Sequence, residues 1–246
     1  MPLSEYFVKK GYSIKSSTTS AVRLSELSAI KIKPFVINIG SLSTNIQTFL
    51  QAEILIINIP VKNRDYFESL LKEIEKSKIK KVLFVSSTSV YGDENCVISE
   101  SDGLESTESP LFKIETLLSN SRKFKITVVR FGGLIGYSRN PGKFFSQGKL
   151  VQNPDANVNL IHRDDCIGII GQIIEQQIWG QEFNCCADTH PTKRQFYTKV
   201  SNAIGFPAPN FVNSKNKLFK VISNTKVKTV LNYEFLHKDL MDITFT

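Results

Sequence analysis

The chain of 246 residues has little of what a membrane protein or a secreted protein requires. Its longest apolar stretch runs from Ile54 to Val61, is interrupted by Asn58, and falls far short of the roughly 20 residues of a membrane-spanning helix. The N-terminal segment MPLSEYFVKKGY carries Glu5 early and has no long apolar centre, which does not fit a secretory signal. We therefore expect a cytoplasmic protein without a membrane partner.

Cysteine and histidine are also scarce. Cys185 and Cys186 are neighbours that would point to opposite faces of a strand, and a chain of this length does not depend on disulfides. We therefore expect reduced, structural thiols. The three histidines are scattered, and no CxxC or HExxH spacing occurs, so the sequence predicts no metal site. The remaining cysteines are Cys96 and Cys166, and the histidines are His162, His190 and His237.

The charge balance is basic but not specialised. The chain has 31 Lys and Arg against 23 Asp and Glu, a net charge of +8, with 41% hydrophobic residues. This is ordinary globular composition. The excess of positive charge permits loose association with nucleic acid, but no interleaving of basic and aromatic residues and no recognition motif makes it specific. We expect no specific nucleic-acid partner.

Short apolar runs alternate with stretches of helical periodicity along the first half of the chain. The runs are rich in β-branched residues and too short for helices, so they predict strands. Such alternation is typical of an α/β fold, here a Rossmann-like, doubly wound parallel sheet, whose ligands bind outside the carboxyl ends of the strands. The predicted strands are residues 12–17, 33–38, 53–59, 81–86 and 124–130, and the predicted helices are 21–30, 64–78 and 107–121.

The pattern loosens after residue 131 into a glycine-bearing loop. We therefore divide the chain into a core, residues 1–131, and a smaller C-terminal substrate lobe, residues 132–246. The lobe is expected to close over the sheet edge, because pockets form at such junctions. Its predicted elements are strands near 158–162 and 182–186 and helices near 164–177, 193–204 and 224–231.

Three segments together resemble one family. They are KVLFVSSTSVYGD at 81–93, VVRFGGLIGYSR at 128–139 and VNLIHRDDC at 158–166. In this order and spacing they resemble the extended and atypical short-chain dehydrogenase/reductase superfamily, in its NAD-dependent epimerase/dehydratase-like branch. The resemblance implies an NAD(P)-binding oxidoreductase or epimerase acting on a small, possibly sugar-nucleotide-like substrate. It also implies a possible homodimer.

Hydroxyl groups follow the predicted strand 81–86. Ser86, Ser87 and Thr88 can donate hydrogen bonds to a substrate oxygen at the binding edge of the sheet. The resemblance places Ser87 at the catalytic hydroxyl, with Thr88 as the second catalytic candidate and Ser86 as a cofactor contact. The alternative is that these hydroxyls only satisfy a turn or cap a helix.

The cofactor preference is expected at the end of the second strand of such a fold. An acid there takes the ribose 2′-hydroxyl of NAD, whereas basic or hydroxyl groups take the 2′-phosphate of NADP. Between Tyr12 and Leu24 there is no acid, but Ser17, Thr18 and Arg23 are present. We therefore expect NADP, with NAD possible, the alternative being that these are plain loop residues.

The resemblance adds five further cofactor contacts by position. Two belong to the loop beside the nicotinamide and three follow the strand that ends beside the adenine and ribose. They are Arg130 and Gly132, and Asn58, Ile59 and Pro60.

Two features of the family are missing. Its chemistry uses a Tyr-x-x-x-Lys pair, in which the lysine lowers the pKa of the tyrosine. In the aligned segment TESPLFKIETLL, Thr107 stands at the tyrosine position and Leu111 at the lysine position. The pair from Tyr6 to Lys10 lies in the first predicted helix and has no catalytic meaning.

The chain also begins with a helix that in the family follows a strand and a glycine-rich turn. We expect the natural product to start upstream by about 10 to 15 residues, enough for that strand and turn. Two alternatives to an enzyme stay open. One is a non-catalytic NADP-binding sensor or regulatory module, and the other is a truncated form unable to bind cofactor.

Overall fold

The computed structural model describes residues 2–145, 148–212 and 218–245. It divides into two compact units. Unit 1 holds the described residues up to Val85, with Pro110–Val128 and Ile178–Gln181. Unit 2 holds Ser86–Ser109, Val129–Gln177 and the described residues from Glu182 onward. The predicted division at residue 131 stays a prediction.

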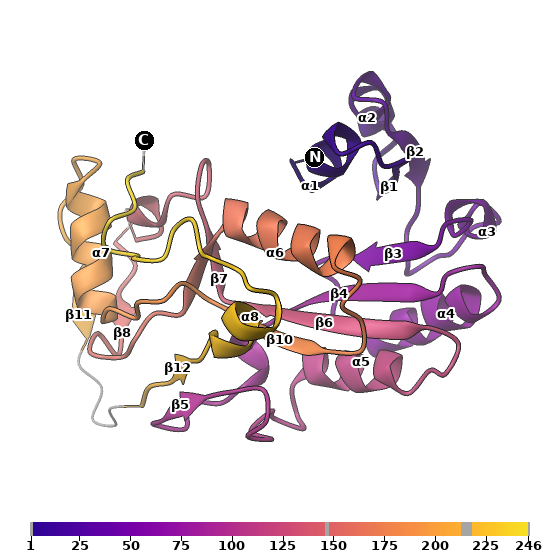
Figure 1. The fold of residues 1–246 in the computed structure, drawn as a ribbon. Coiled ribbons are helices and arrows are strands. Elements are labelled where there is room, and N and C mark those ends of the chain that lie inside the picture. Colours follow the sequence, from indigo (N-terminus) through magenta and orange to yellow (C-terminus); the bar gives the residue numbers. More distant parts are fainter. Residues whose placement is uncertain (1, 146–147, 213–217, 246) are drawn as a thin grey trace. The chain divides into compact units, whose positions relative to one another are not determined.

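The fold is α/β with parallel pairing, as predicted (Figure 1). The largest sheet has four strands in the order β10, β6, β4, β3. Strand β3 pairs in parallel with β4, with Ile54 opposite Lys81. Strands β3, β4 and β6 coincide with β-branched apolar runs, as buried parallel strands require, whereas β10 has the sequence EFNC. The four strands are β3 (Ile54–Ile57), β4 (Lys81–Ser87), β6 (Lys125–Phe131) and β10 (Glu182–Cys185).

Unit 1 also contains a second, two-stranded parallel sheet. Strands β1 and β2 pair with Thr18 opposite Val36. Helix α4 starts at a side-chain cap, because Asn63 Oδ1 accepts the backbone N–H groups of Asp65 and Tyr66. The remaining elements are α1 (Pro2–Lys9), β1 (Lys15–Thr18), the short 3₁₀ helix η1 (Ala21–Arg23), α2 (Leu24–Ala29), β2 (Lys33–Val36), α3 (Ile46–Phe49), α4 (Arg64–Glu75) and α5 (Pro110–Ser119).

Helix α5 begins later than the predicted start at residue 107. Its first residue is Pro110, which has no backbone N–H to lose and whose fixed φ suits the first helical position. Before it, the N–H of Ser109 bonds to the carbonyl of Ser106 in a turn. The helical periodicity of the sequence continues through this turn, and for that reason the predicted start of the helix, residue 107, was wrong by three residues.

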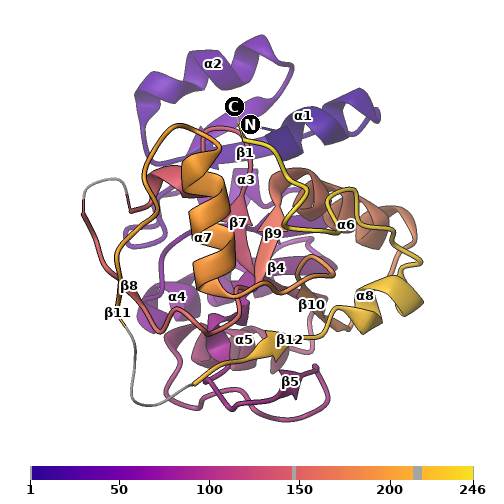
Figure 2. The ribbon, with the colours of Figure 1, turned by 90° about the vertical axis from the view of Figure 1, so that its left-hand side faces the viewer.

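Among its described residues, unit 2 has short strands, three α-helices and two short 3₁₀ helices. Figure 2 shows these elements from a second side. Strands β7 and β9 pair in parallel, with Ile135 opposite His162. Phe196 and Val200 of α7 are buried in one cluster with Ile135 and Leu160. The elements are β5 (Val97–Ile98), β7 (Gly133–Ile135), β8 (Val151–Gln152), β9 (Leu160–His162), α6 (Arg163–Glu175), α7 (Lys193–Asn202), β11 (Phe211–Val212), β12 (Val221–Ile222) and α8 (Thr225–Val230), with short 3₁₀ helices at Thr88–Val90 (η2) and Pro141–Lys143 (η3).

Two general expectations can be compared with the described residues. The four cysteines are free, and Cys166, Cys185 and Cys186 are buried, which agrees with reduced structural thiols. In the part of the chain that the structure describes, no helix combines the length and apolar composition needed to cross a bilayer.

We expect Phe67→Ala to destabilise unit 1 strongly. Phe67 is completely buried on α4 and meets Phe84 of β4 edge to face, with ring centroids 5.8 Å apart. The lost transfer free energy and the remaining cavity should cost about 3–5 kcal/mol in the free energy of unfolding. Denaturant unfolding followed by circular dichroism measures it. The control Val22→Ala, at a side chain 82% exposed, should stay within about 0.5 kcal/mol, and a similar small loss for Phe67→Ala would contradict the packing.

Candidate functional site

The hydroxyl groups expected at the sheet edge lie at the end of β4. Ser86 and Thr88 are buried, whereas Ser87 is half-buried. Ser87 Oγ accepts the backbone N–H of Ser89 at 3.1 Å and so caps the 3₁₀ helix η2. This contact uses one lone pair of the oxygen and leaves its O–H group, for which the described residues provide no acceptor. The cap and a catalytic role for Ser87 are therefore compatible.

The residues expected to select the cofactor lie at the end of β1 in unit 1. Ser17 is exposed, and Thr18 Oγ1 accepts the N–H of Ser20 at 3.2 Å within the turn. Arg23 is exposed, and its Nε lies 3.5 Å from Glu26 Oε2. The sequence has no acid between Tyr12 and Leu24, and Glu26 lies just beyond that range. The structure therefore places a carboxylate beside Arg23 that the prediction of NADP did not take into account.

The segment after β3 is open to solvent. Asn58 and Pro60 are exposed and Ile59 is half-buried. All three follow the last residue of a parallel strand, Ile57, which is the edge at which such sheets bind ligands. Their contact with a cofactor stays a prediction.

Arg130 is a completely buried charged residue of unit 2. Its side chain is completely inaccessible. Its guanidinium donates to Tyr91 Oη at 2.5 Å, to Glu105 at 2.5 Å and to Glu182 Oε2 at 3.1 Å. Two carboxylates and a phenol therefore hold the positive charge within the protein, and a direct contact of Arg130 with a cofactor stays a prediction.

Tyr91 extends this buried network. Its hydroxyl donates to Asn184 Oδ1 at 3.0 Å, and the N–H of Asn184 donates to Glu100 Oε1 at 2.6 Å. Burial raises the pKa of Tyr91 to about 12, although Arg130 and Asn184 act in the opposite direction. The sequence shows Tyr91 in its V-Y-G turn, but no spacing rule connects it with Arg130, Asn184 or Glu100, so the network was missed.

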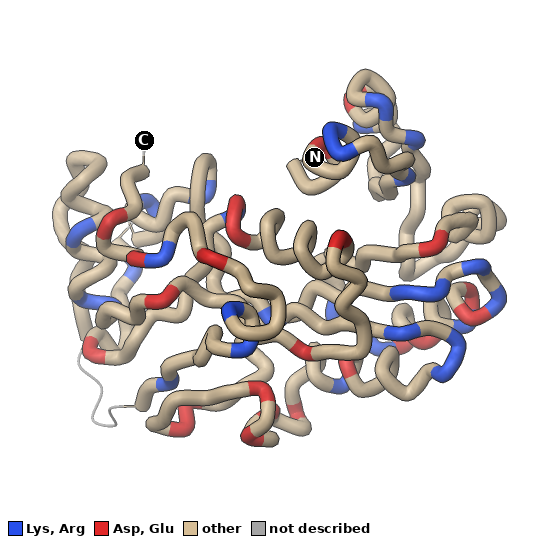
Figure 3. Tube along the Cα trace, viewed as in Figure 1, with Lys and Arg blue, Asp and Glu red and all other residues tan. Residues whose placement is uncertain are grey.

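The segment around β5 is strongly acidic (Figure 3). Several of its carboxylates have structural partners. Glu105 pairs with Arg130. Asp102 accepts both the N–H and the hydroxyl of Ser99, at 2.7 and 2.8 Å, and these bonds lower the pKa of the Asp102 carboxyl. These two acidic residues of the segment thus have structural partners within unit 2.

Gly132, the second residue expected in the nicotinamide loop, lies in a tight contact. A Cβ there would come within 2.7 Å of the Asn159 carbonyl oxygen and 2.9 Å of Cys186 Sγ. Its N–H also donates to the carbonyl of Cys185 at 2.9 Å. These contacts explain why glycine is required at this position, and a cofactor contact stays a prediction.

The positions of the missing catalytic pair differ in environment. Thr107 is exposed in the turn before α5, and Leu111 is buried in the first turn of that helix, with 8% of its surface exposed. Neither side chain has a group that titrates near neutral pH. The local acid-base chemistry of a Tyr-x-x-x-Lys pair is therefore absent at these positions.

We expect Tyr91 to make unfolding sensitive to alkaline pH. The folded pKa of about 12 lies above the ordinary tyrosine pKa of 10.0, so the phenol of the unfolded chain loses its proton at lower pH than that of the folded chain. The stabilisation is complete below about pH 10 and is lost as pH rises toward about 12. Tyr91→Phe should therefore show a smaller fall of unfolding free energy over this interval than the wild type. Tyr66→Phe, at an exposed tyrosine, should match the wild type, and equal falls in all three proteins would contradict the assignment.

Comparison with known proteins shows similarity over nearly the whole chain. No protein-family model matches the sequence. Protein YeeZ of Escherichia coli K12 is 27% identical, over 97% of this chain and 93% of that protein. The structure of a functionally unknown conserved protein from Silicibacter pomeroyi superposes with a TM-score of 0.82 at 18% identity, covering 98% of this chain and 91% of the other.

A solved enzyme shares the same architecture. UDP-glucuronic acid 4-epimerase from Bacillus cereus, in complex with NAD, superposes with a TM-score of 0.77 at 17% identity, covering 98% of this chain and 91% of that chain. This chain therefore has the Rossmann-like α/β fold that is found in NAD-dependent epimerases.

Proposed function

We propose that this chain binds a nicotinamide dinucleotide, with NADP preferred, through the carboxyl ends of its parallel strands. The observation that supports this most strongly is the shared fold with an epimerase solved in complex with NAD. In folds of this kind the ligand lies outside the carboxyl ends of the strands. Ser17 and Thr18 are the last residues of β1, Arg23 follows that strand, and Asn58 follows β3.

The donor groups at these strand ends fit one half of the cofactor. Exposed hydroxyl, amide and guanidinium groups can bind the ribose and a 2′-phosphate. The chain contains no G-x-G-x-x-G turn for the pyrophosphate. The proposal for binding therefore concerns the adenosine side of the dinucleotide.

The preference for NADP depends on Arg23. Its partner Glu26 is exposed, with 57% of that side chain accessible, and surface ion pairs of this kind contribute little stability. A phosphate dianion can therefore compete for the guanidinium, with which it forms strong, charge-assisted hydrogen bonds. Glu26 is then the residue that opposes NADP, and Arg23 the residue that favours it.

We expect NADPH to bind at least about tenfold more tightly than NADH, as measured by fluorescence titration of the reduced cofactors. Arg23→Glu should weaken NADPH binding by at least about tenfold, or about 1.4 kcal/mol, and change NADH binding much less. Arg122→Glu is the matched control, because Arg122 is also exposed but precedes β6 at its amino end.

Two outcomes would contradict different parts of this proposal. Equal or tighter binding of NADH would contradict the preference for NADP and leave dinucleotide binding supported. Failure of both cofactors to bind, with no rise in the melting temperature at millimolar cofactor, would contradict dinucleotide binding, because a ligand of the native state must stabilise it.

We further propose an oxidoreductase- or epimerase-like activity on a small, sugar-nucleotide-like substrate. A bound nicotinamide supplies hydride transfer. Ser87 donates its O–H to an oxygen of the substrate while its Oγ stays fixed by the N–H of Ser89. Ser86 and Thr88 flank it on the same segment and complete the set of hydroxyls.

A second candidate function is a binding module without turnover. It is favoured by Thr107 and Leu111, which cannot carry out the proton transfer of the missing pair. General acid-base catalysis contributes about 10²- to 10⁴-fold to rates. An enzyme that lacks the pair is slow by such a factor, and a sensor needs no turnover.

We expect slow reduction of NADP or NAD with UDP-glucose as the probe, followed by absorbance at 340 nm. Ser87→Ala should reduce the rate by at least about tenfold, because one donor to the reacting oxygen is lost. Ser89→Ala, two residues further on, should keep the rate within about twofold. Cofactor titration of each variant separates loss of turnover from loss of binding.

Undetectable turnover with intact cofactor binding would contradict the enzyme and support the binding module. Thr107→Tyr combined with Leu111→Lys is then informative, because a gain of turnover would show that the other groups of the site are in place. We also predict that two chains pair through α4 and α5, which light scattering tests. The cytoplasmic location stays a prediction.

A further inference from the structure

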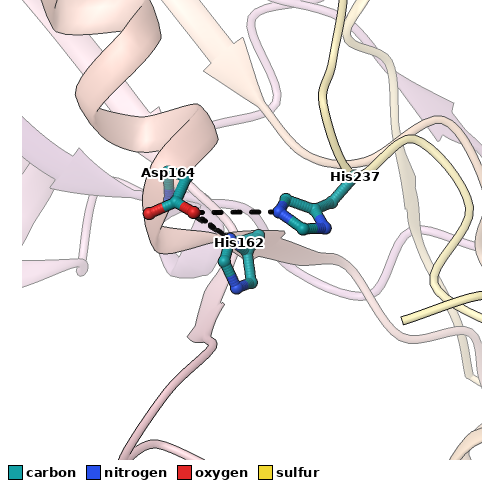
Figure 4. A group of neighbouring side chains, drawn as sticks. All are labelled: His162, Asp164 and His237. Carbon is teal, nitrogen blue, oxygen red and sulfur yellow. Dashed lines mark hydrogen bonds and ion pairs between the residues drawn. The ribbon is translucent and has the colours of Figure 1, made fainter. Parts of the chain in front are cut away.

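Three potential metal ligands from two distant segments of the sequence converge in unit 2. His162 is the last residue of β9, Asp164 lies in the first turn of α6, and His237 comes from the C-terminal segment (Figure 4). Asp164 Oδ2 lies 3.6 Å from His162 Nδ1 and 3.9 Å from His237 Nε2. One ligand atom from each residue lies within 4.8 Å of the other two. The imidazole rings themselves lie 3.7 Å apart, centroid to centroid.

The arrangement brings two electron-rich atoms together. His162 Nδ1 accepts the backbone N–H of Asp164 at 3.3 Å, so this nitrogen carries a lone pair. The same nitrogen faces the carboxylate of Asp164, which also accepts. A cation bound here would take the place of the Asp164 N–H on His162 Nδ1 and would compensate the charge of the Asp164 carboxylate.

The position of His237 is fixed by a buried carboxylate. Asp165 is completely buried and accepts the N–H of Leu236 at 2.7 Å and the N–H of His237 at 3.1 Å. Tyr233 donates its hydroxyl to the same carboxylate at 3.0 Å. The C-terminal segment is thus attached to the start of α6, and the imidazole of His237 is held beside Asp164.

The position of His162 is fixed by a glycine. A Cβ at Gly136 would come within 2.3 Å of His162 Nε2. The ring is therefore packed on the backbone of Gly136, and Nδ1 is the nitrogen directed toward Asp164. Gly136 has a φ of +110°, so other residues are strained there as well.

The carboxylate of Asp164 has two different sides. Its Oδ1 lies 3.8 Å from Arg163 Nε, whereas its Oδ2 accepts the hydroxyl of Tyr137 at 2.8 Å and faces both imidazoles. The guanidinium of Arg163 stacks over the ring of Tyr137, 3.5 Å from its centroid. Asp164 is thus oriented by an outer partner in the manner of carboxylates that bind metals.

We propose that His162, Asp164 and His237 form a binding site for a divalent transition-metal cation of the Zn²⁺ type, with an open fourth position. Zinc bonds of about 2.0–2.2 Å in a tetrahedron require ligand atoms about 3.3–3.5 Å apart. The two distances to Asp164 Oδ2 exceed this by a few tenths of an ångström. The two imidazoles, whose centroids lie 3.7 Å apart, must also turn so that one nitrogen of each points at the same ion. Two imidazoles select zinc, cobalt or nickel over magnesium and calcium, which prefer oxygen ligands.

The site is independent of dinucleotide binding, and all of its groups belong to unit 2. Sequence spacing did not predict it, because His162 and Asp164 are two residues apart but His237 lies in a separate segment without a recognisable motif. Three protein ligands and an open position are the arrangement of catalytic zinc sites, in which the cation can bind a water or a substrate oxygen.

The test uses the purified full chain after treatment with a chelator. Zinc titration against a chromophoric competitor should show one tight site per chain, and Co²⁺ should give the visible absorption of tetrahedral coordination. His237→Ala and Asp164→Asn should each weaken binding by at least about a hundredfold. Tyr137→Phe should weaken it by about tenfold, as loss of an outer partner does.

The third histidine supplies the matched control. His190 is also partly buried, but its Nδ1 contacts the carbonyl of Val158, away from this cluster. His190→Ala and Cys96→Ser should bind zinc as the wild type does. Circular dichroism verifies that each variant is folded, and His237 tolerates substitution because about a third of its side chain is exposed. Absence of a tight site in the wild type, or binding that survives both His237→Ala and Asp164→Asn, would overturn the proposal.

Discussion

A single buried positive charge sets the internal structure of unit 2. The guanidinium of Arg130 is out of contact with water and must therefore be neutralised within the protein. Glu105, Glu182 and Tyr91 do this from three separate segments of the chain. Removal of either carboxylate would leave a buried guanidinium N–H without its acceptor, so the end of β6, the start of β10 and the acidic segment are held in one arrangement. The turn that follows β4, with its hydroxyl groups, is fixed by the same network through Tyr91.

The sequence predicted the main strands because their residues are locally distinctive. Runs such as ILII in β3 and KVLFVSS in β4 are β-branched and apolar, and parallel strands buried on both faces need this composition. Strands of two or three residues, such as β5 and β7, are too short for a periodic signal. The start of α5 was misplaced because periodicity extends through a turn, and only the stereochemistry of Pro110 locates the first helical residue.

The candidate site divides in the same way. The sequence could locate Ser87 at the carboxyl end of a strand, where parallel sheets bind ligands, and its role there stays a prediction. The partners of Arg130 and the approach of His237 to Asp164 could not be predicted, because they depend on tertiary contacts between distant segments. Leu111, which the resemblance aligns with a lysine, is buried and contributes to the core of unit 1. Function therefore has to be argued from side chains and not from architecture.

The reactivity of the buried cysteines can be used to measure local unfolding of unit 2. Burial raises the pKa of Cys185 and Cys166 well above the ordinary value and that of Cys186 to about 12. Only the thiolate reacts with alkylating reagents, so these sulfurs are inert while they are enclosed. Cys96 is partly exposed in the same unit and serves as an internal reference. The rate of alkylation of Cys166 and Cys185, relative to that of Cys96, therefore measures how often α6 and β10 open to solvent by local unfolding.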